Sequence, residues 1–379
     1  IGIDLDNTII SYDQAFAVAA ERQGLVAPDN DLNKDKVRSL VRALPDGERS
    51  WQQLQGHVYG KGIGLATLFR GVERFLWRCH NRSIDVEIVS HKTRFGHHDL
   101  EQISLRDAAD RFLAERGVVG VDSAPISSVS YFDSRDDKIT YISEGKFDWF
   151  IDDLPEVVCD HRLNTSPMVL FGANSSSEKL NDQSFTAISW DEVEQKVLGA
   201  WKESEAFALA TKLLTPLSIE SVTRLPGRGN SQIYQVVLPD GQRLAMKLYP
   251  QKGAHNRLLA EYGATTLFKQ LDLKSVQRPF TMDSQLGVGI YEWIDGEQMT
   301  QFGSKEILAS LELIRAINQP VVRPTFKDFG FACDACISGK DVQSQLMRRL
   351  KQFDSAREQN DNLDKFFSLR FLPLVEQVI

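Results

Sequence analysis

Four aspartates occur in two pairs in the first half of the chain, each pair close behind a short apolar run. Asp4 and Asp6 follow residues 1–3, and Asp152 and Asp153 follow residues 149–151. Carboxylates that converge need a cation to compensate their charge, and hard oxygen ligands of this kind suit Mg²⁺. Magnesium commonly shares its shell with a substrate phosphate, and an aspartate can accept a phosphoryl group as a nucleophile. The pattern predicts a magnesium site with these four aspartates as candidate ligands, and phosphoryl transfer as the reaction.

Three apolar runs would bring these side chains together if the runs are parallel strands. Residues 1–3, 86–89 and 149–151 are short, bounded by polar residues and joined by helix-like stretches, which is typical of buried parallel strands. Ligands of such sheets bind outside the carboxyl ends of the strands. Ser90, which follows the second run, is therefore expected to share one crevice with the aspartates.

These residues resemble the motifs of the haloacid dehalogenase-like (HAD) superfamily, in the same order and strand context. Asp4 and Asp6 match its first motif, Ser90 its second, Lys138 its third and the pair at 152–153 its fourth. The resemblance implies that Asp4 attacks phosphorus, that Asp6 acts as general acid and then base, and that Ser90 and Lys138 hold the phosphoryl oxygens. A dehalogenase attacking carbon has no leaving-group oxygen to protonate, so Asp6 favours a phosphatase.

The resemblance also implies the metal ligands: the side chains of Asp4 and Asp152 and the backbone carbonyl of Asp6 would hold Mg²⁺. Lys146 competes with Lys138 for the phosphate-binding role, because both precede the paired aspartates. Lys138 is preferred because it would begin a helix over residues 138–142, whereas Lys146 lies in a turn. Two alternatives remain: the aspartates at 4 and 6 are turn caps, or the domain binds phosphate without turnover.

Composition limits the classes of protein that the chain can represent. Its 379 residues are enough for two or more domains, and its net charge of −8 gives no basic footprint for nucleic acid. Four cysteines do not suggest a disulfide framework, and no apolar run is long enough to span a bilayer. A cytoplasmic protein is the expectation. The chain begins at Ile1 inside a predicted strand, so its natural start is expected to lie upstream.

The sequence predicts an α/β fold: a Rossmann-like parallel sheet with a helical cap, then an α+β kinase-like N-lobe and the start of a helical C-lobe. The cap would be an insertion at about residues 11–75, helical at 15–20 and 37–44, which closes over the crevice and excludes water. The expected divisions are 1–187 for the HAD-like domain, 188–214 for a linking helix that begins with the capping-box residues Ser189 and Glu192, 215–300 for the N-lobe and 301–379 for a helical segment.

Several polar residues of the insertion and of the loop after Ser90 are candidates for a place at the crevice. Trp51, Gln52, Gln53 and His57 could contact substrate, although each alone is more typical of a structural or solvent-facing residue. The adjacent residues His97 and His98 are typical of a loop, and no metal role is predicted for them.

A second set of residues, in a region rich in strand and turn patterns, has the order of a nucleotide site. Gly227, Gly229 and Ser231 lie in a glycine-rich loop, and Lys247 follows in a strand after the turn at 239–241. In kinase-type folds such a loop covers the ATP phosphates, the lysine pairs with them, and a helix glutamate orients the lysine. Glu261 lies in a helix-like stretch at the right place for that role.

Residues 213–300 resemble the N-terminal lobe of the aminoglycoside phosphotransferase and choline kinase family. The resemblance implies ATP as ligand, with Gly227, Gly229, Ser231, Lys247, Glu261 and the hinge-like segment around Glu292 as its binding residues. The small phosphorylated metabolite and ATP are thus the expected small-molecule partners of the two halves.

The chain departs from this kinase family in one important respect. No histidine follows His255, so the His-x-Asp catalytic loop is missing. Asp328–Gly330 reads Asp-Phe-Gly, but nothing upstream supplies that loop, and we interpret the match as coincidence. Cys333 and Cys336 are interpreted as two helical thiols. The catalytic half is expected beyond residue 379; alternatively, the kinase-like half is a non-catalytic nucleotide-binding or scaffolding module.

Overall fold

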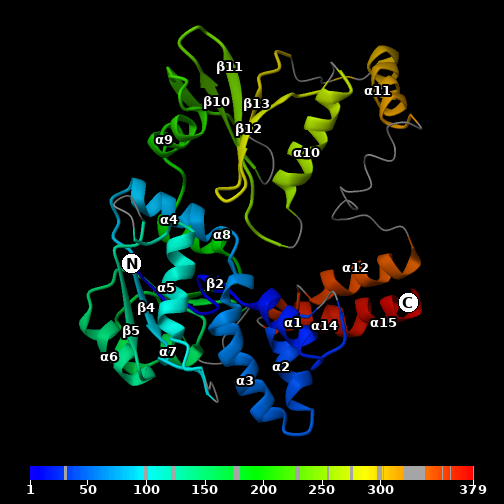
Figure 1. The fold of residues 1–379 in the computed structure, drawn as a ribbon. Helices are drawn as coiled ribbons and strands as arrows, with labels where there is room; N and C mark the ends of the chain where they lie inside the picture. The colour runs from blue at the N-terminus through cyan, green and yellow to red at the C-terminus, as the bar shows by residue number, and fades with distance from the viewer. Residues whose placement is uncertain are drawn as a thin grey trace. The chain divides into compact units, whose positions relative to one another are not determined.

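The protein is mixed α/β, with a six-stranded parallel sheet and a separate five-stranded antiparallel sheet (Figure 1). The structure is a computed structural model, and it describes residues 1–29, 32–97, 101–120, 125–173, 180–226, 231–253, 256–273, 276–296, 301, 303–319, 338–351, 353–358 and 360–378. The chain forms two compact units. The first contains Ile1–Ala254 and Phe280–Glu292, and the second contains His255–Pro279 and Trp293–Ile379.

The parallel sheet has the strand order β5-β4-β1-β6-β7-β8, and all of its pairings are parallel. The predicted runs at residues 1–3, 86–89 and 149–151 form its three central strands, so the prediction of parallel strands is confirmed. An edge strand after residue 180 was not singled out from the sequence. The strands are β1 (Gly2–Ile3), β4 (Glu87–His91), β5 (Ser128–Phe132), β6 (Phe150–Asp152), β7 (Met168–Phe171) and β8 (Phe185–Ala187).

Helices cover both faces of this sheet, which explains why its strands are apolar runs without alternation. Phe150 and Ile151 are neighbours in β6, yet they belong to different buried clusters because successive side chains point to opposite faces. On the Ile151 face the cluster includes side chains of α4 (Val72–Asn81) and α5 (Leu105–Glu115). On the Phe150 face it includes side chains of α6 (Arg135–Glu144) and α7 (Pro155–Val158).

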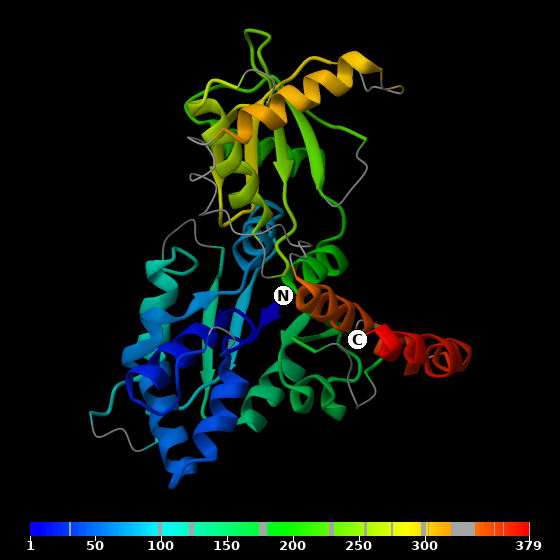
Figure 2. The same cartoon turned by 90° about the vertical axis from the view of Figure 1, so that its right-hand side faces the viewer.

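The insertion after the first strand is helical, as the sequence predicted. A two-stranded antiparallel sheet of β2 (Ile10–Ser11) and β3 (Thr67–Leu68) holds its two ends together. Between them, three helices pack side by side, as Figures 1 and 2 show. Phe16 and the buried Trp51 stack with ring centroids 5.0 Å apart, so Trp51 is a core residue of the insertion. The helices are α1 (Asp13–Arg22), α2 (Lys34–Arg42) and α3 (Gly47–Tyr59), followed by a 3₁₀ turn at Lys61–Leu65.

The structure corrects the expectation of one continuous helix over residues 188–214. Helix α8 (Trp190–Val193) passes into a π-helical segment, Glu194–Leu198, and the chain breaks at Gly199 before α9 (Glu203–Leu214). The φ angle of Gly199 is 67°, in the left-handed region that glycine tolerates at least cost. The Ser189 side chain makes no capping bond to the helix that follows it.

The antiparallel sheet has the order β12-β13-β11-β10-β9. A turn at Asp240 and Gly241, where glycine has a φ of 82°, joins β10 to β11 as predicted. Side chains of α9 share a buried cluster with one face of this sheet, which includes Tyr234 and Met246. The strands are β9 (Ser221–Arg224), β10 (Gln232–Val237), β11 (Arg243–Leu248), β12 (Pro279–Asp283) and β13 (Val288–Glu292).

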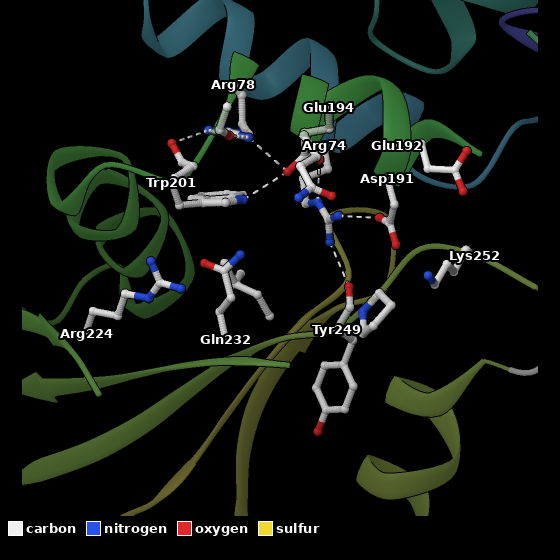
Figure 3. A pocket seen from close by; sticks show the side chains of 15 residues that line it. Arg74, Arg78, Asp191, Glu192, Glu194, Trp201, Arg224, Gln232, Tyr249 and Lys252 are labelled. Atoms are coloured by element: carbon white, nitrogen blue, oxygen red, sulfur yellow. Dashed lines mark hydrogen bonds and ion pairs between the residues drawn. The ribbon is translucent and has the colours of Figure 1, made fainter. Parts of the chain in front are cut away.

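A buried network of ion pairs joins α4 to the chain segments around the antiparallel sheet (Figure 3). Arg74 and Arg78 lie four residues apart on α4 and are almost fully buried. Arg74 donates to Glu194 at 2.8 Å and to the Tyr249 carbonyl oxygen at 2.7 Å. Arg78 donates to Glu194 at 3.0 Å and to Glu205 at 2.9 Å. The end of β11 and the start of α9 are therefore tied to the same helix.

The same network extends by one more arginine and by an aspartate. Arg82, one turn further along α4, donates to Glu205 Oε2 at 2.6 Å, and Arg74 also donates to Asp191 at 2.6 Å. The indole nitrogen of Trp201 donates to Glu194 at 2.9 Å. Three arginines thus face three carboxylates, so the buried charges balance.

The described part of the second unit is helical after residue 301, in agreement with the prediction for residues 301–379. Among the described residues, no helix has both the length and the apolar character needed to cross a membrane. The Asp328–Gly330 motif, Cys333 and Cys336 lie outside the described residues. The helices of this unit are α10 (Arg257–Gln270), α11 (Ser304–Ile317), α12 (Gly339–Lys351), α13 (Asp354–Glu358), α14 (Asp361–Phe366) and α15 (Leu372–Val378), with a π-helical segment at Phe367–Phe371.

Candidate functional site

Asp4, Lys138 and Asp152 meet at the carboxyl ends of β1 and β6. The register between these strands is held by the bond from the Asp4 amide to the Ile151 carbonyl oxygen, at 2.8 Å. The buried Lys138 ammonium donates to Asp4 Oδ1 and to Asp152 Oδ2, each at 2.6 Å. The structure therefore brings the predicted residues of the first, third and fourth motifs together.

The position of Lys138 follows from where its helix begins. Helix α6 begins at Arg135, three residues earlier than predicted, because the Ser134 side chain caps it by accepting from the Asp137 amide at 3.0 Å. Lys138 consequently lies in the first turn and reaches the strand ends. Lys146, the competing lysine, is exposed.

Asp153 completes an acidic group with Asp4 and Asp152. Each of the three carboxylates offers an oxygen, and these oxygens lie within 4.8 Å of one another. Burial raises the pKa of Asp4 to about 7; Lys138 opposes this shift, and Asp152 and Asp6 add to it. Burial, with the charges of Asp152 and Asp4, raises the pKa of Asp153 to about 8. Three carboxylates against one ammonium leave an excess of two negative charges, which a divalent oxygen-seeking cation fits.

Asp6 lies apart from this acidic group, in a setting that the sequence reasoning did not foresee. Its carboxylate accepts from the Lys92 ammonium at 2.7 and 2.9 Å and from the Tyr12 hydroxyl at 2.6 Å. Burial acts to raise the pKa of Asp6, but the charge and hydrogen bonds of Lys92 outweigh it and hold the pKa below its ordinary value. A signal for Lys92 was present, because it follows Ser90 by two residues and alternation along a strand places such residues on the same side.

The insertion contributes a second lysine that was missed. Lys34, at the start of α2, donates from Nζ to Asn7 Oδ1 at 3.0 Å and lies 5.8 Å from the centroid of the Tyr59 ring. Burial lowers the pKa of Lys34, against the opposing charges of Asp153 and Asp6. Nothing in the sequence around Lys34 distinguishes it from a solvated lysine of a helix.

A small cavity and two buried hydroxyls complete the site. The cavity has a volume of about 90 Å³ and is lined by Asp4, Asp6, Lys138 and Asp153, among others. Ser90 Oγ and Thr8 Oγ1 are buried and have no hydrogen-bond partner within the described residues. Neither residue is among those that line the cavity, but a buried hydroxyl without a partner is costly, so each of these groups needs a hydrogen-bond partner.

The other polar residues of the insertion lie elsewhere. Gln53, His57 and His97 line a separate cavity of about 150 Å³ that shares no lining residue with the cavity at Asp4. Gln52 Nε2 lies 3.5 Å from Glu48 Oε1, one turn back along α3. His98 lies outside the described residues.

The residues of the predicted nucleotide site are only partly described. Gly227 and Gly229 lie outside the described residues, and Ser231 Oγ is buried without a hydrogen-bond partner in the part that is described. Lys247 lies in β11, paired with Ile233 and Gly289, and its Nζ is 4.7 Å from the centroid of the Tyr249 ring.

The two glutamates of that site come from different elements. Glu292 ends β13 opposite Leu244 of β11. Glu261 lies in α10, which belongs to the second unit. The structure thus leaves the assembly of these residues as a prediction.

No protein-family profile and no curated protein sequence matches the chain. Solved structures of two kinds are similar to it at low identity: HAD-superfamily hydrolases and kinase-like proteins. A putative fructosamine-3-kinase from Thermobifida fusca is 22% identical with a TM-score of 0.21; the match covers 24% of this chain and 32% of that protein, about a third of its length. Protein Tyrosine Kinase A of Mycobacterium tuberculosis is 16% identical with a TM-score of 0.37, over 52% of this chain and 96% of that one. A HAD-superfamily hydrolase from Geobacter sulfurreducens is 14% identical with a TM-score of 0.33, over 51% and 95%.

Proposed function

We propose that the chain is a magnesium-dependent phosphatase that acts on a small phosphorylated metabolite through an aspartyl-phosphate at Asp4. One observation carries the proposal: oxygens of Asp4, Asp152 and Asp153 gather within 4.8 Å of one another beside the bridging ammonium of Lys138. The unpartnered hydroxyl of Ser90 supports it, because a phosphoryl oxygen is the acceptor that such a buried donor needs.

The metal would be held by the side chains of Asp4, Asp152 and Asp153 together with the backbone carbonyl of Asp6. When bound, Mg²⁺ supplies positive charge that compensates the carboxylates and the phosphoryl oxygens. The site requires the cation because of its charge. Without Mg²⁺ the pKa values of Asp4 and Asp153 are raised to about 7 and 8, so both carboxyl groups resist ionisation near neutral pH.

The residues of the chain would then divide the chemistry between two steps. An Asp4 carboxylate oxygen attacks phosphorus, the bond to the leaving oxygen breaks, and Asp6 donates the proton that this oxygen takes up. Water next attacks the phosphorus of the aspartyl-phosphate, and Asp6 takes the proton of that water. Lys138 and Ser90 hold the phosphoryl oxygens. Lys92 and Tyr12 orient the Asp6 carboxylate, and Lys92 favours its ionised form, the form needed in the second step. The proton that Asp6 donates in the first step must therefore be taken up when the anionic substrate binds.

Magnesium dependence tests the proposal. We expect release of phosphate from a panel of small phosphate esters to fall by about 100-fold or more in EDTA and to recover when Mg²⁺ is added in excess, because the acidic group needs a cation. Phosphate release measured by a colorimetric assay checks this. An equal rate in EDTA would contradict the metal site, and Mg²⁺-dependent phosphate binding without any release would favour the non-catalytic alternative.

We also propose that ATP binds the antiparallel sheet on the face that carries Lys247. Strand alternation places Lys247 opposite the face of Met246, which is buried against α9, so the lysine is on the side that α9 leaves open. This half could have either of two functions: it transfers phosphate from ATP to a small molecule, or it binds the nucleotide without transfer. The missing His-x-Asp loop favours binding without transfer for the residues present.

Exchange of Lys247 tests the ATP site, and an assay of phosphate transfer separates the two functions. Lys247→Met is expected to weaken ATP binding about tenfold or more, because it removes a charge-assisted contact to phosphate. Isothermal titration calorimetry measures the binding, with the exposed Lys212 changed to Met as the matched control. Transfer of the γ-phosphate to a panel of sugars and amino alcohols would show a kinase; binding with no transfer would show a nucleotide-binding module. Equal affinity of the Lys247 and Lys212 variants would overturn the assignment of Lys247.

A further inference from the structure

A larger cavity, of about 390 Å³, lies within the first unit and is distinct from the carboxylate site. It is enclosed by α4, by the chain from Asp191 to Trp201 and by one end of the antiparallel sheet (Figure 3). Its volume lies in the range of roughly 300–1,000 Å³ that is typical of small-molecule sites. The space is therefore large enough for a metabolite.

One side of this cavity, here called its floor, is formed by residues of the ion-pair network: Arg74, Arg78, Glu194 and Trp201. Their charged groups are already paired with one another or with neighbouring residues. Each guanidinium nitrogen of Arg74 and Arg78 donates to a carboxylate or a carbonyl oxygen, and Trp201 donates its indole proton to Glu194. Every charge of the floor is therefore neutralised by a neighbour. A ligand would be selected by the remaining side chains of the wall.

Two cations on the wall differ from those of the floor. Arg224, at the end of β9, and Lys252, after β11, line the cavity, and within the described residues neither side chain has a hydrogen-bond or ion-pair partner. Figure 3 shows Arg224 beside Gln232 on one side of the pocket and Lys252 on the other. The carboxylate of Glu192 also lines the wall, but its Oε2 accepts from the Ile188 amide at 3.0 Å. The wall thus carries an excess of positive charge.

This cavity lies on a different face of the sheet from the predicted ATP lysine. Arg224 is directly opposite Tyr234, and Tyr234 points into the cluster that includes side chains of α9. Lys247 is opposite Ile233, the neighbour of Tyr234, and so points to the other face. A ligand in the cavity would not contact Lys247.

We propose that this cavity binds a small, multiply charged anion of the phosphate-ester class. Arg224 offers a planar fork suited to a phosphate group, Lys252 offers a point charge on the opposite wall, and the Gln232 amide offers a neutral hydrogen-bonding group beside Arg224. Two separated cations fit a ligand with two anionic groups better than a single anion. The proposal does not depend on hydrolysis at Asp4.

Titration of the full chain with inorganic pyrophosphate in metal-free buffer tests the site. Calorimetry is expected to show saturable binding of one pyrophosphate per chain. The double variant Arg224→Gln/Lys252→Gln should bind at least about tenfold more weakly, because both charge-assisted contacts are removed.

The control for this experiment removes the same charge elsewhere. Arg22→Gln/Lys212→Gln changes two exposed cations of α1 and α9 that do not line the cavity. It should retain the affinity of the natural chain. Absence of saturable binding, or equal weakening in the two double variants, would overturn the proposal. Circular dichroism of each variant establishes that the fold is retained.

Discussion

Replacement of Asp4 by asparagine is expected to abolish phosphate-ester hydrolysis, with a fall in kcat of roughly 10⁴-fold or more, the range seen when a catalytic nucleophile is removed. Asparagine keeps the shape of the side chain but has no anionic oxygen with which to attack phosphorus. Lys138 would keep its bond to Asp152, so the fold should persist. Steady-state phosphate release with saturating Mg²⁺ measures the change.

The matched control for this prediction is Asp85→Asn. Asp85 is exposed and lies two residues before the start of β4, so it is at the amino end of the strand rather than at the carboxyl ends where the site lies. That variant should hydrolyse esters at the rate of the natural chain. Retained hydrolysis in Asp4→Asn, with Asp85→Asn unchanged, would rule out Asp4 as nucleophile.

The same exchange should also change the pH dependence of stability when metal is absent. The pKa of Asp4 is raised from 3.8 to about 7 in the folded protein, so between these values the folded state binds more protons than the unfolded state. The contribution of Asp4 to the free energy of unfolding therefore falls as the pH rises through this range. Asparagine does not titrate, so thermal unfolding in EDTA between pH 4 and 7 should show a smaller decline in Tm for Asp4→Asn. An identical decline in Tm in both proteins would contradict the raised pKa of Asp4.

Replacement of Arg78 by methionine is expected to destabilise the first unit by about 3–5 kcal/mol, the usual cost of breaking a buried ion pair from one side. The side chain of Arg78 is fully buried, and its loss would leave Glu194 and Glu205 with less compensating charge. Burial acts to raise the pKa of Glu205, but hydrogen bonds from Arg82 and Arg78 outweigh it and lower the pKa to about 2. Glu205, which would still accept from Arg82, would thus remain charged and buried.

Equilibrium unfolding in urea measures this effect, with Arg111→Met as the control. Arg111 is an exposed arginine of α5, and its exchange should change the free energy of unfolding by less than about 0.5 kcal/mol. A small effect of Arg78→Met, equal to that of Arg111→Met, would show that the network does not hold α4 to the antiparallel sheet.

The central strands and the strand-end aspartates could be predicted from the sequence, because their signals are local. A short apolar run followed by a polar residue marks the end of a buried strand, and the rules of parallel sheets then place Asp4, Ser90 and Asp152 at one edge. The structure places Lys138, the lysine preferred for the phosphate-binding role, beside Asp4 and Asp152, and that role stays a prediction. The helix of Lys138 begins three residues earlier than predicted, at the cap formed by Ser134.

The partners of these residues were decided only by the tertiary structure. Lys92 meets Asp6 across 86 residues of sequence, and Arg78 meets Glu205 across 127. Strand alternation could place Lys92 on the same side as Ser90, but no local pattern among the 44 lysines and arginines identifies Asp6 as its partner or Glu205 as the partner of Arg78. Which charges are buried together depends on how helices and sheets pack. Short stretches of sequence therefore predict where the strands end, whereas the pairing of charges around those ends is set only by the packing of the folded chain.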